Sequence, residues 1–128
     1  MANGRMNLSV ESEQRLGRVM SHLELNDRRP DALRLAFVKG LRECKEIPPK
    51  KEGKTGFVIP DQVIAKGAEY VLYKHLIIEK VGRPLDAKGV DDYMLRYIEA
   101  GLEMMEQEIA SLSELDNYML YLVDKYGS

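Results

Sequence analysis

The sequence predicts a mainly α-helical protein in which one short N-terminal strand leads into a helical hairpin and further helices, all within a single domain. Its 128 residues, 45% of them apolar, suit one domain with one hydrophobic core. The opening stretch RMNLSVESEQRL alternates apolar and polar residues and then changes to helical spacing. From residue 16 onward, apolar residues recur at helical spacing in several further stretches, with no internal repeat between them.

The strand is expected at residues 5–8, with Met6 and Leu8 on one face and Arg5 and Asn7 on the other. A single strand leaves its backbone N–H and C=O groups unpaired, so it must pair with a second strand. We expect that partner to be the same strand of a second copy, antiparallel across a two-fold axis. The strand is thereby predicted to join subunits.

Two helices are predicted to follow the strand. Ser9 stands at the N-cap position of the first, with Glu11 and Glu13 near the positive end of its dipole. Pro30 suits the first position of the second, where its missing N–H costs nothing. The first helix, ending near Glu24, has an apolar face of Leu16, Val19, Met20 and Leu23; the second has Leu33, Ala36, Phe37 and Leu41, flanked by Leu35 and Val38. Because its apolar residues cover more than half of its circumference, the second helix is expected to be buried on several sides.

The rest of the chain is expected to add one short extended piece and further helices. Residues 47–56 read as a loop from their Pro, Gly and Lys content, and FVIP, residues 57–60, as an extended piece. A third helix is predicted at 68–81 with Gly82 as its stop, and a fourth at 90–108. Ser111 and Glu114 have capping-box spacing, which predicts that a final helix opens or is re-capped there. The expected inward residues are Val71, Leu72, His75, Leu76 and Ile78 in the third helix, Met94, Tyr97, Ile98, Leu102 and Met105 in the fourth, and Leu115, Met119, Leu122 and Val123 in the last.

Residues that usually carry catalysis or bind metals are sparse. Cys44 is the only cysteine, which excludes an internal disulfide, and the helix around it offers no histidine to activate its thiol. One cysteine and two distant histidines, His22 and His75, do not make a metal-ligand spacing. The GKTG stretch lacks the upstream glycine and the strand-to-helix context of a P-loop. We therefore expect no catalytic residues, no metal and no cofactor.

The chain carries no sequence signal for a membrane or for export. No apolar run approaches the ~20 residues of a membrane span. The opening MANGRMNLSV lacks the apolar region of a signal peptide. A soluble cytoplasmic protein without membrane contact is therefore expected.

Charge is distributed unevenly along the chain. Residues 1–58 carry 12 Lys and Arg against 8 Asp and Glu, a net charge of +4, whereas the remaining residues carry 7 against 13, a net charge of −6. This asymmetry suggests one face for phosphate and another for a different partner, although scattered solvated charges would give the same numbers. The candidate DNA-backbone contacts are Arg28 and Arg29 in the turn, Lys50, Lys51 and Lys54 in the loop, and Arg15 and Arg18 on the first helix. The helix and turn arginines would form one surface if the hairpin closes normally.

Residues 5–46, in the order strand, helix, turn, helix, resemble the ribbon-helix-helix family of DNA-binding proteins. In that family, paired strands from two chains place their outward side chains in the major groove. The resemblance implies this role for Arg5 and Asn7. Their side chains can pair with guanine and adenine edges, respectively.

A longer ordered set of stretches resembles the DndE family of bacterial DNA phosphorothioation proteins. In order, the stretches are LSVESEQRLGRVMSHLEL, LRLAFVKGL, FVIP, YVLYKHLIIEKVGRPLD and YIEAGLEMM, and together they span roughly residues 6–110. The resemblance implies a non-catalytic protein that forms homo-oligomers, described as tetramers, and binds double-stranded DNA with a preference for nicked duplex. It also implies partner proteins that carry out the sulfur transfer: a cysteine desulfurase, an adenylating sulfurtransferase and an ATPase-like protein.

The chain departs from that family in two places. The turn LELNDRRP lacks the expected glycine, which leaves Asn26 as the residue best able to adopt a positive φ. The segment after residue 110 is longer than expected and could add an oligomer or partner surface. The single domain, residues 1–128, is thus divided into the ribbon-helix-helix-like part at 5–46 and a helical remainder at 57–126.

The sequence leaves three functions open. The leading hypothesis is a non-catalytic DNA-binding subunit of a phosphorothioation system, which contacts backbone phosphates. The first alternative is a ribbon-helix-helix transcriptional repressor or antitoxin that reads an operator through Arg5 and Asn7. The second is an interaction scaffold that does not contact DNA and docks a partner through its acidic second half.

Overall fold

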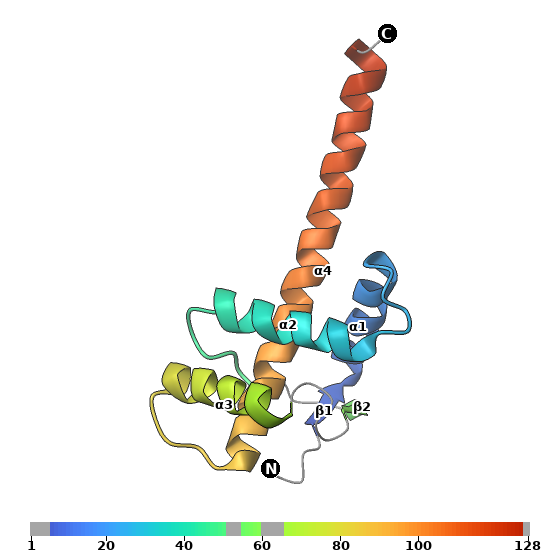
Figure 1. Ribbon diagram of the computed structural model, residues 1–128. Coiled ribbons are helices and arrows are strands. Elements are labelled where there is room, and N and C mark those ends of the chain that lie inside the picture. Colours follow the sequence, from blue (N-terminus) through green and yellow to red (C-terminus); the bar gives the residue numbers. More distant parts are fainter. Residues whose placement is uncertain (1–5, 51–54, 60–65, 127–128) are drawn as a thin grey trace.

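One long helix, α4, forms the axis of the structure, and the other elements lie along its N-terminal half (Figure 1). The computed structural model describes residues 6–50, 55–59 and 66–126. In chain order the elements are β1 (Met6–Ser9), α1 (Val10–His22), α2 (Arg29–Glu43), β2 (Thr55–Ile59), α3 (Gly67–Val81) and α4 (Ala87–Tyr126). The mainly α-helical single domain with a short leading strand is therefore confirmed.

The strand β1 pairs with β2 of the same chain, so along this edge it does not need the strand of a second copy that the sequence led us to expect. The two strands are antiparallel, with Met6 opposite Ile59 and Asn7 opposite Val58, and an irregularity follows before Ser9. Met6, Leu8 and Ile59 are buried, whereas Asn7 and Val58 are exposed. The alternation along the strand was predicted correctly, but its partner begins at Thr55, inside a stretch that composition assigned to a loop.

The first helix begins as the sequence predicts. The Ser9 side chain accepts a hydrogen bond from the Ser12 N–H at 3.1 Å, so Ser9 is the N-cap. Leu16, Val19 and Met20 are buried, but Leu23, which was expected on the same face, is exposed beyond the end of the helix.

The turn after α1 uses Glu24, and not Asn26, as its residue with positive φ. Glu24 has a φ of +58°. Its N–H donates to the Ser21 carbonyl at 3.3 Å, and the Leu25 N–H donates to the Met20 carbonyl at 2.8 Å. These two bonds form a Schellman motif, in which glycine is the usual residue at the position of Glu24. A side chain there costs roughly 1–2 kcal/mol relative to an ordinary helical conformation.

The second helix buries a single face against α4 and the core. Leu33, Ala36, Phe37 and Leu41 are buried as predicted. Leu35 and Val38 are exposed, so the expectation that this helix is buried on several sides was wrong. The structure covers only the side that faces α4 and the neighbouring α3, where the rings of Phe37 and Tyr73 lie 4.8 Å apart.

At their crossing, α2 and α4 approach so closely that only glycine fits. A Cβ atom on Gly40 would lie 2.1 Å from the Tyr97 carbonyl oxygen. A Cβ atom on Gly101 would lie 1.8 Å from the Ala36 carbonyl oxygen. Real Cβ atoms do not come this close to backbone oxygens, so each glycine permits the contact of two helix backbones.

The third helix spans the predicted residues but turns a different face inward. It ends at Gly82, whose φ of +82° gives the expected left-handed C-cap. Ile77 is buried, whereas Val71, Leu72 and His75, expected inward, are exposed. Partly buried residues complete the packed side: Tyr70, Tyr73, Leu76 and Val81. Because α3 is apolar on most of its circumference, its spacing alone could not indicate which side packs.

The last helix, α4, is continuous through Ser111, so the predicted opening or re-capping of a final helix there was wrong. It begins earlier than predicted, because the Asp86 side chain accepts from the Gly89 N–H at 2.7 Å. Its 40 residues span about 60 Å. Met94, Tyr97, Ile98 and Leu102 are buried as predicted. Beyond about residue 108 the helix projects alone, as the orange-to-red end in Figure 1 shows, and Met119 and Val123 are exposed.

We expect Gly101→Ala to destabilise the protein by about 2–4 kcal/mol, because α2 and α4 must separate to admit the new methyl group. Gly40→Ala should have an effect of similar size. Gly17→Ala is the matched control, since this helical glycine is exposed and has no atom within 4 Å of its added Cβ. It should gain about 0.5–1 kcal/mol from higher helix propensity. The measurement is urea unfolding of the three variants; equal midpoints for Gly101→Ala and the wild type would contradict the close crossing.

Candidate nucleic-acid interface

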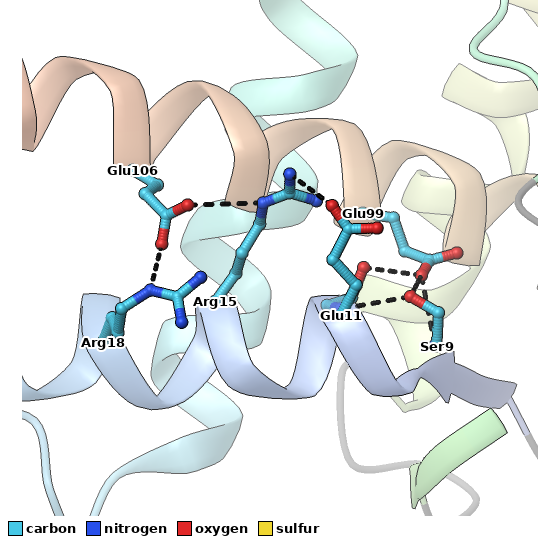
Figure 2. A network of polar contacts seen from close by, with 7 residues as sticks. Ser9, Glu11, Arg15, Arg18, Glu99 and Glu106 are labelled. Carbon is cyan, nitrogen blue, oxygen red and sulfur yellow. Dashed lines mark hydrogen bonds and ion pairs between the residues drawn. The ribbon is translucent and has the colours of Figure 1, made fainter. Parts of the chain in front are cut away.

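Two carboxylates on one face of α4 hold α1 alongside it. Glu99 and Glu106 are seven residues apart, about two turns, and therefore lie on the same side of the helix. Figure 2 shows α1 running along this side, with Ser9 next to Glu99 and the arginines of α1 next to Glu106. The polar groups of the first helix are thereby positioned by acidic groups of the last.

Glu99 is a buried carboxylate, 3% exposed, that accepts three hydrogen bonds on its Oε2 atom. The donors are the Ser9 N–H at 3.2 Å, the Ser9 Oγ–H at 2.8 Å and the Ser12 Oγ–H at 2.6 Å. A buried charge without such donors would be costly. Because all three donors come from the β1–α1 junction, the carboxylate fixes the point at which the strand becomes a helix.

Arg15 and Arg18, two of the candidate DNA contacts, are brought together by Glu106. Arg18 Nε donates to Glu106 Oε2, and Arg15 Nε lies 3.4 Å from Glu106 Oε1. Arg15 also pairs with Glu11 at 2.6 Å, and its side chain is only 14% exposed. The Arg18 hydrogen bond, followed by the charges of both arginines, lowers the pKa of Glu106, so this carboxylate stays ionised at neutral pH. Arg15 is therefore held in an internal network, while Arg18 remains largely on the surface.

Arg28 and Arg29 lie where the turn meets α2, as the sequence predicts, and both are exposed. Arg28 is the N-cap residue of α2, and its side chain makes no capping hydrogen bond. Its side chain is 67% exposed and pairs with Asp31 at 2.6 Å. Exposed ion pairs of this kind contribute about 0–1 kcal/mol, so a phosphate group can replace the carboxylate at little cost.

Among the residues that the structure describes, the other candidate DNA contacts do not join these arginines on one surface. Lys50 is exposed and lies 3.6 Å from Asp92, which is about 21 Å along α4 from Glu106. Asn7 is exposed on β1. Arg5, Lys51 and Lys54 lie outside the described residues. The structure thus separates Lys50, near the start of α4, from Arg15 and Arg18, which lie farther along the same helix.

Basic residues of the first half pair with acidic residues of the second half, which explains much of the charge asymmetry. Arg15 and Arg18 pair with Glu106, Lys39 with Glu108, and Lys50 with Asp92. Arg34 adds a pair at 3.8 Å with Glu69 on α3. These charges therefore hold the two halves of the chain together, so the asymmetry does not require a surface for an outside partner.

The sequence reasoning missed the residues that build this arrangement. Ser9 was assigned only a capping role, and Ser12, Glu99, Lys39 and Glu106 were not singled out. The available signal was the seven-residue spacing of Glu99 and Glu106 on a predicted helix, together with the basic and hydroxyl residues of the first helix. The seven-residue spacing becomes informative only once α1 is known to pack against α4, and the sequence did not predict that packing.

The other chemistry-bearing residues keep their structural roles. Cys44 is partly buried, and this burial raises the pKa of its thiol, which disfavours the nucleophilic thiolate. Among the described residues, no three His, Cys, Asp or Glu side chains gather as a metal site would require.

Within the described residues, no helix combines the length and the apolar character needed to cross a membrane. No family model, curated protein or solved structure matches the chain.

Replacing Ser12 by alanine should lower the free energy of unfolding by about 1.5–3 kcal/mol, because the buried Glu99 carboxylate loses its shortest hydrogen bond. Ser21→Ala, at an exposed position near the end of the same helix, is the control and should change stability by less than about 0.5 kcal/mol. Chemical denaturation followed by circular dichroism measures both. Equal effects of the two substitutions would show that Glu99 does not depend on α1 for its hydrogen bonds.

Proposed function

We propose that this protein is a non-catalytic DNA-binding subunit of a bacterial DNA phosphorothioation system, working in the cytoplasm and holding duplex DNA, intact or nicked, through its backbone phosphates. The observation that carries the proposal is the pair of exposed arginines, Arg28 and Arg29, at the N-terminal end of α2. The ordered resemblance to the DndE family supports the wider role. That resemblance also supplies the proposed partners: duplex DNA, the sulfur-transfer proteins and further copies of the chain.

The N-terminal end of α2 suits a phosphate group for two physical reasons. The guanidinium group of arginine matches phosphate oxygens in bidentate geometry. The positive end of the helix dipole adds to the attraction of any anion placed there. Asp31, in the first turn of α2, already places one negative charge at this end of the helix. Its surface ion pair with Arg28 is weak enough for a phosphate to compete.

Arg18 is the next contact in this proposal. Its side chain is exposed on α1, although it is hydrogen-bonded to Glu106. Arg15 contributes less, because its contacts with Glu11 and Glu106 bury most of the side chain. The proposed interface is therefore smaller than the sequence indicated and centres on the turn between α1 and α2.

The repressor alternative has weaker support. It needs strands of two copies to form a ribbon that places Arg5 and Asn7 in the major groove. One edge of β1 is instead taken by β2 of the same chain. Asn7 remains exposed, so substitution of this residue still separates reading of bases from contact with phosphates.

The double variant Arg28→Ala/Arg29→Ala should bind every duplex more weakly, by a similar factor for each sequence. Each lost phosphate contact should reduce the slope of log K against log salt by about 0.9, so the pair should reduce it by about 2. Binding is measured by fluorescence anisotropy on intact, nicked and scrambled duplexes across a salt series.

Two control variants make this test specific. Lys66→Ala/Lys88→Ala removes the same charge from exposed positions outside the turn and should leave affinity and slope unchanged. Asn7→Ala should also leave them unchanged. No affinity of the wild type for any duplex at low salt would overturn the proposal, and loss of a preference for one sequence on Asn7→Ala would favour the repressor.

A further inference from the structure

We propose that the base of α4 carries a binding site for one phosphate group with two negative charges, either inorganic phosphate or the end of a phosphate monoester. The site, called the α4-base cluster below, consists of Lys50, Arg83, Asp92, Tyr93 and Arg96. It lies at the opposite end of the helix from the projecting part (Figure 1). The proposal does not depend on DNA binding.

Three separate segments of the chain build the α4-base cluster. Asp92, Tyr93 and Arg96 stand within about 100° of one another around α4 and therefore share one side of the helix. Lys50 comes from the segment after α2, and Arg83 comes from the loop between α3 and α4. Residues so far apart in the sequence meet on one side of a helix only because the fold brings them there.

The ring of Tyr93 positions the two arginines of the cluster. The guanidinium carbon of Arg96 lies over the ring, 4.6 Å from its centroid, as in a cation–π contact. Arg83 Nη2 donates a hydrogen bond to the Tyr93 hydroxyl oxygen at 3.2 Å. Because this oxygen accepts from Arg83, its own proton can be donated to an anion. One aromatic side chain thus holds a guanidinium group over its face and another at its hydroxyl.

The cluster carries more positive than negative charge. Its carboxylate, Asp92, lies 3.0 Å from Arg96 Nη2 through Oδ2 and 3.6 Å from Lys50 Nζ through Oδ1. Two nearby carboxylates have other positions: Asp86 caps α4, and Asp91 is buried about 140° around the helix from Arg96. Three cations beside one carboxylate leave the cluster with an excess of two positive charges.

One donor of the cluster is buried without a hydrogen-bond partner. The Arg96 side chain is 23% exposed, and its Nε atom is buried and makes no hydrogen bond. Such donors are rare in native proteins and often mark a position where a water or an ion binds. This observation is independent of the charge count, and both indicate an anion as the ligand.

The charge of the cluster favours a terminal phosphate over other anions. At neutral pH a phosphate monoester carries a charge of about −1.5 to −2, which matches the excess of the cluster. A carboxylate or a phosphate of the DNA backbone carries a single negative charge. Guanidinium groups pair with phosphate oxygens in bidentate geometry, and the cluster offers two of them beside a hydroxyl and an ammonium group.

Isothermal titration calorimetry of the full chain, near neutral pH and at low salt, tests the site with inorganic phosphate and with adenosine 5′-monophosphate. We expect a dissociation constant on the order of 0.1–1 mM. Arg83→Gln should weaken binding at least ~10-fold, because a charge-assisted hydrogen bond is lost. Arg42→Gln is the matched control: it removes the same charge from an exposed position in the last turn of α2 and should bind like the wild type.

The outcomes of this titration separate the two sources of the phosphate group. Tighter binding of the monophosphate would identify a monoester as the ligand, and equal binding would identify the phosphate group alone. Either result supports the site. Binding by the wild type weaker than about 10 mM, or equal loss in Arg83→Gln and Arg42→Gln, would overturn the proposal. Displacement of bound phosphate by duplex DNA would overturn the assignment of a terminal phosphate.

Two further variants test the charge and the hydroxyl group separately. Asp92→Asn removes the carboxylate that competes with the ligand for Lys50 and Arg96, so phosphate should bind about threefold more tightly or better. A cluster with only a structural role would show no such gain. Tyr93→Phe keeps the ring under Arg96 but removes the hydroxyl donor, and it should weaken binding roughly 3–10-fold. Circular dichroism checks that both variants are folded, and phosphate binding unchanged in both would overturn the proposal.

Discussion

The approach of α2 to α4 at Gly40 and Gly101 sets the position of the other elements. With no side chain at either glycine, the two helix backbones come into contact: Gly40 lies against the backbone of Tyr97, and Gly101 lies against the backbone of Ala36. Glu99 lies two residues before Gly101 and therefore on the opposite side of α4, where it holds the β1–α1 junction. One turn of a single helix thus organises packing on one side and hydrogen bonding on the other.

Local signals in the sequence predicted where helices begin and end. Ser9, Pro30 and Gly82 act through the backbone of their own neighbours, so their roles hold regardless of what packs nearby. The partner of β1 could not be predicted in this way, because the pairing joins residues about 50 positions apart. In α3 the apolar residues surround the helix, so the covered side depends on packing against distant elements, of which the ring contact of Tyr73 with Phe37 is one example. At Ser111 a capping-box spacing occurs inside a continuous helix, so the spacing alone did not mark an end.

Only the local features of the candidate site could be predicted from the sequence, because its long-range ion pairs join distant parts of the chain. The turn arginines Arg28 and Arg29 are exposed as a turn composition suggests. Arg15 and Arg18 have the same chemistry, but Glu106 from a distant helix engages both of them. Arg15 and Arg28 both pair with carboxylates of their own chain, but the contacts of Arg15 bury most of its side chain, whereas the pair of Arg28 with Asp31 is exposed and weak, so Arg15 is the poorer candidate contact. Counting charges along a sequence does not reveal which of them are already paired.

The central claim is that the backbone contact of α2 with α4 at Gly40 and Gly101 holds the core together, while the end of α4 projects away from it (Figure 1). Amide hydrogen exchange of the wild type and of Gly101→Ala tests this most directly. Residues 90–108 should be strongly protected in the wild type and lose much of that protection in Gly101→Ala, whereas residues 110–126 should exchange rapidly in both proteins. Equal protection of residues 90–108 in the two proteins would contradict the account.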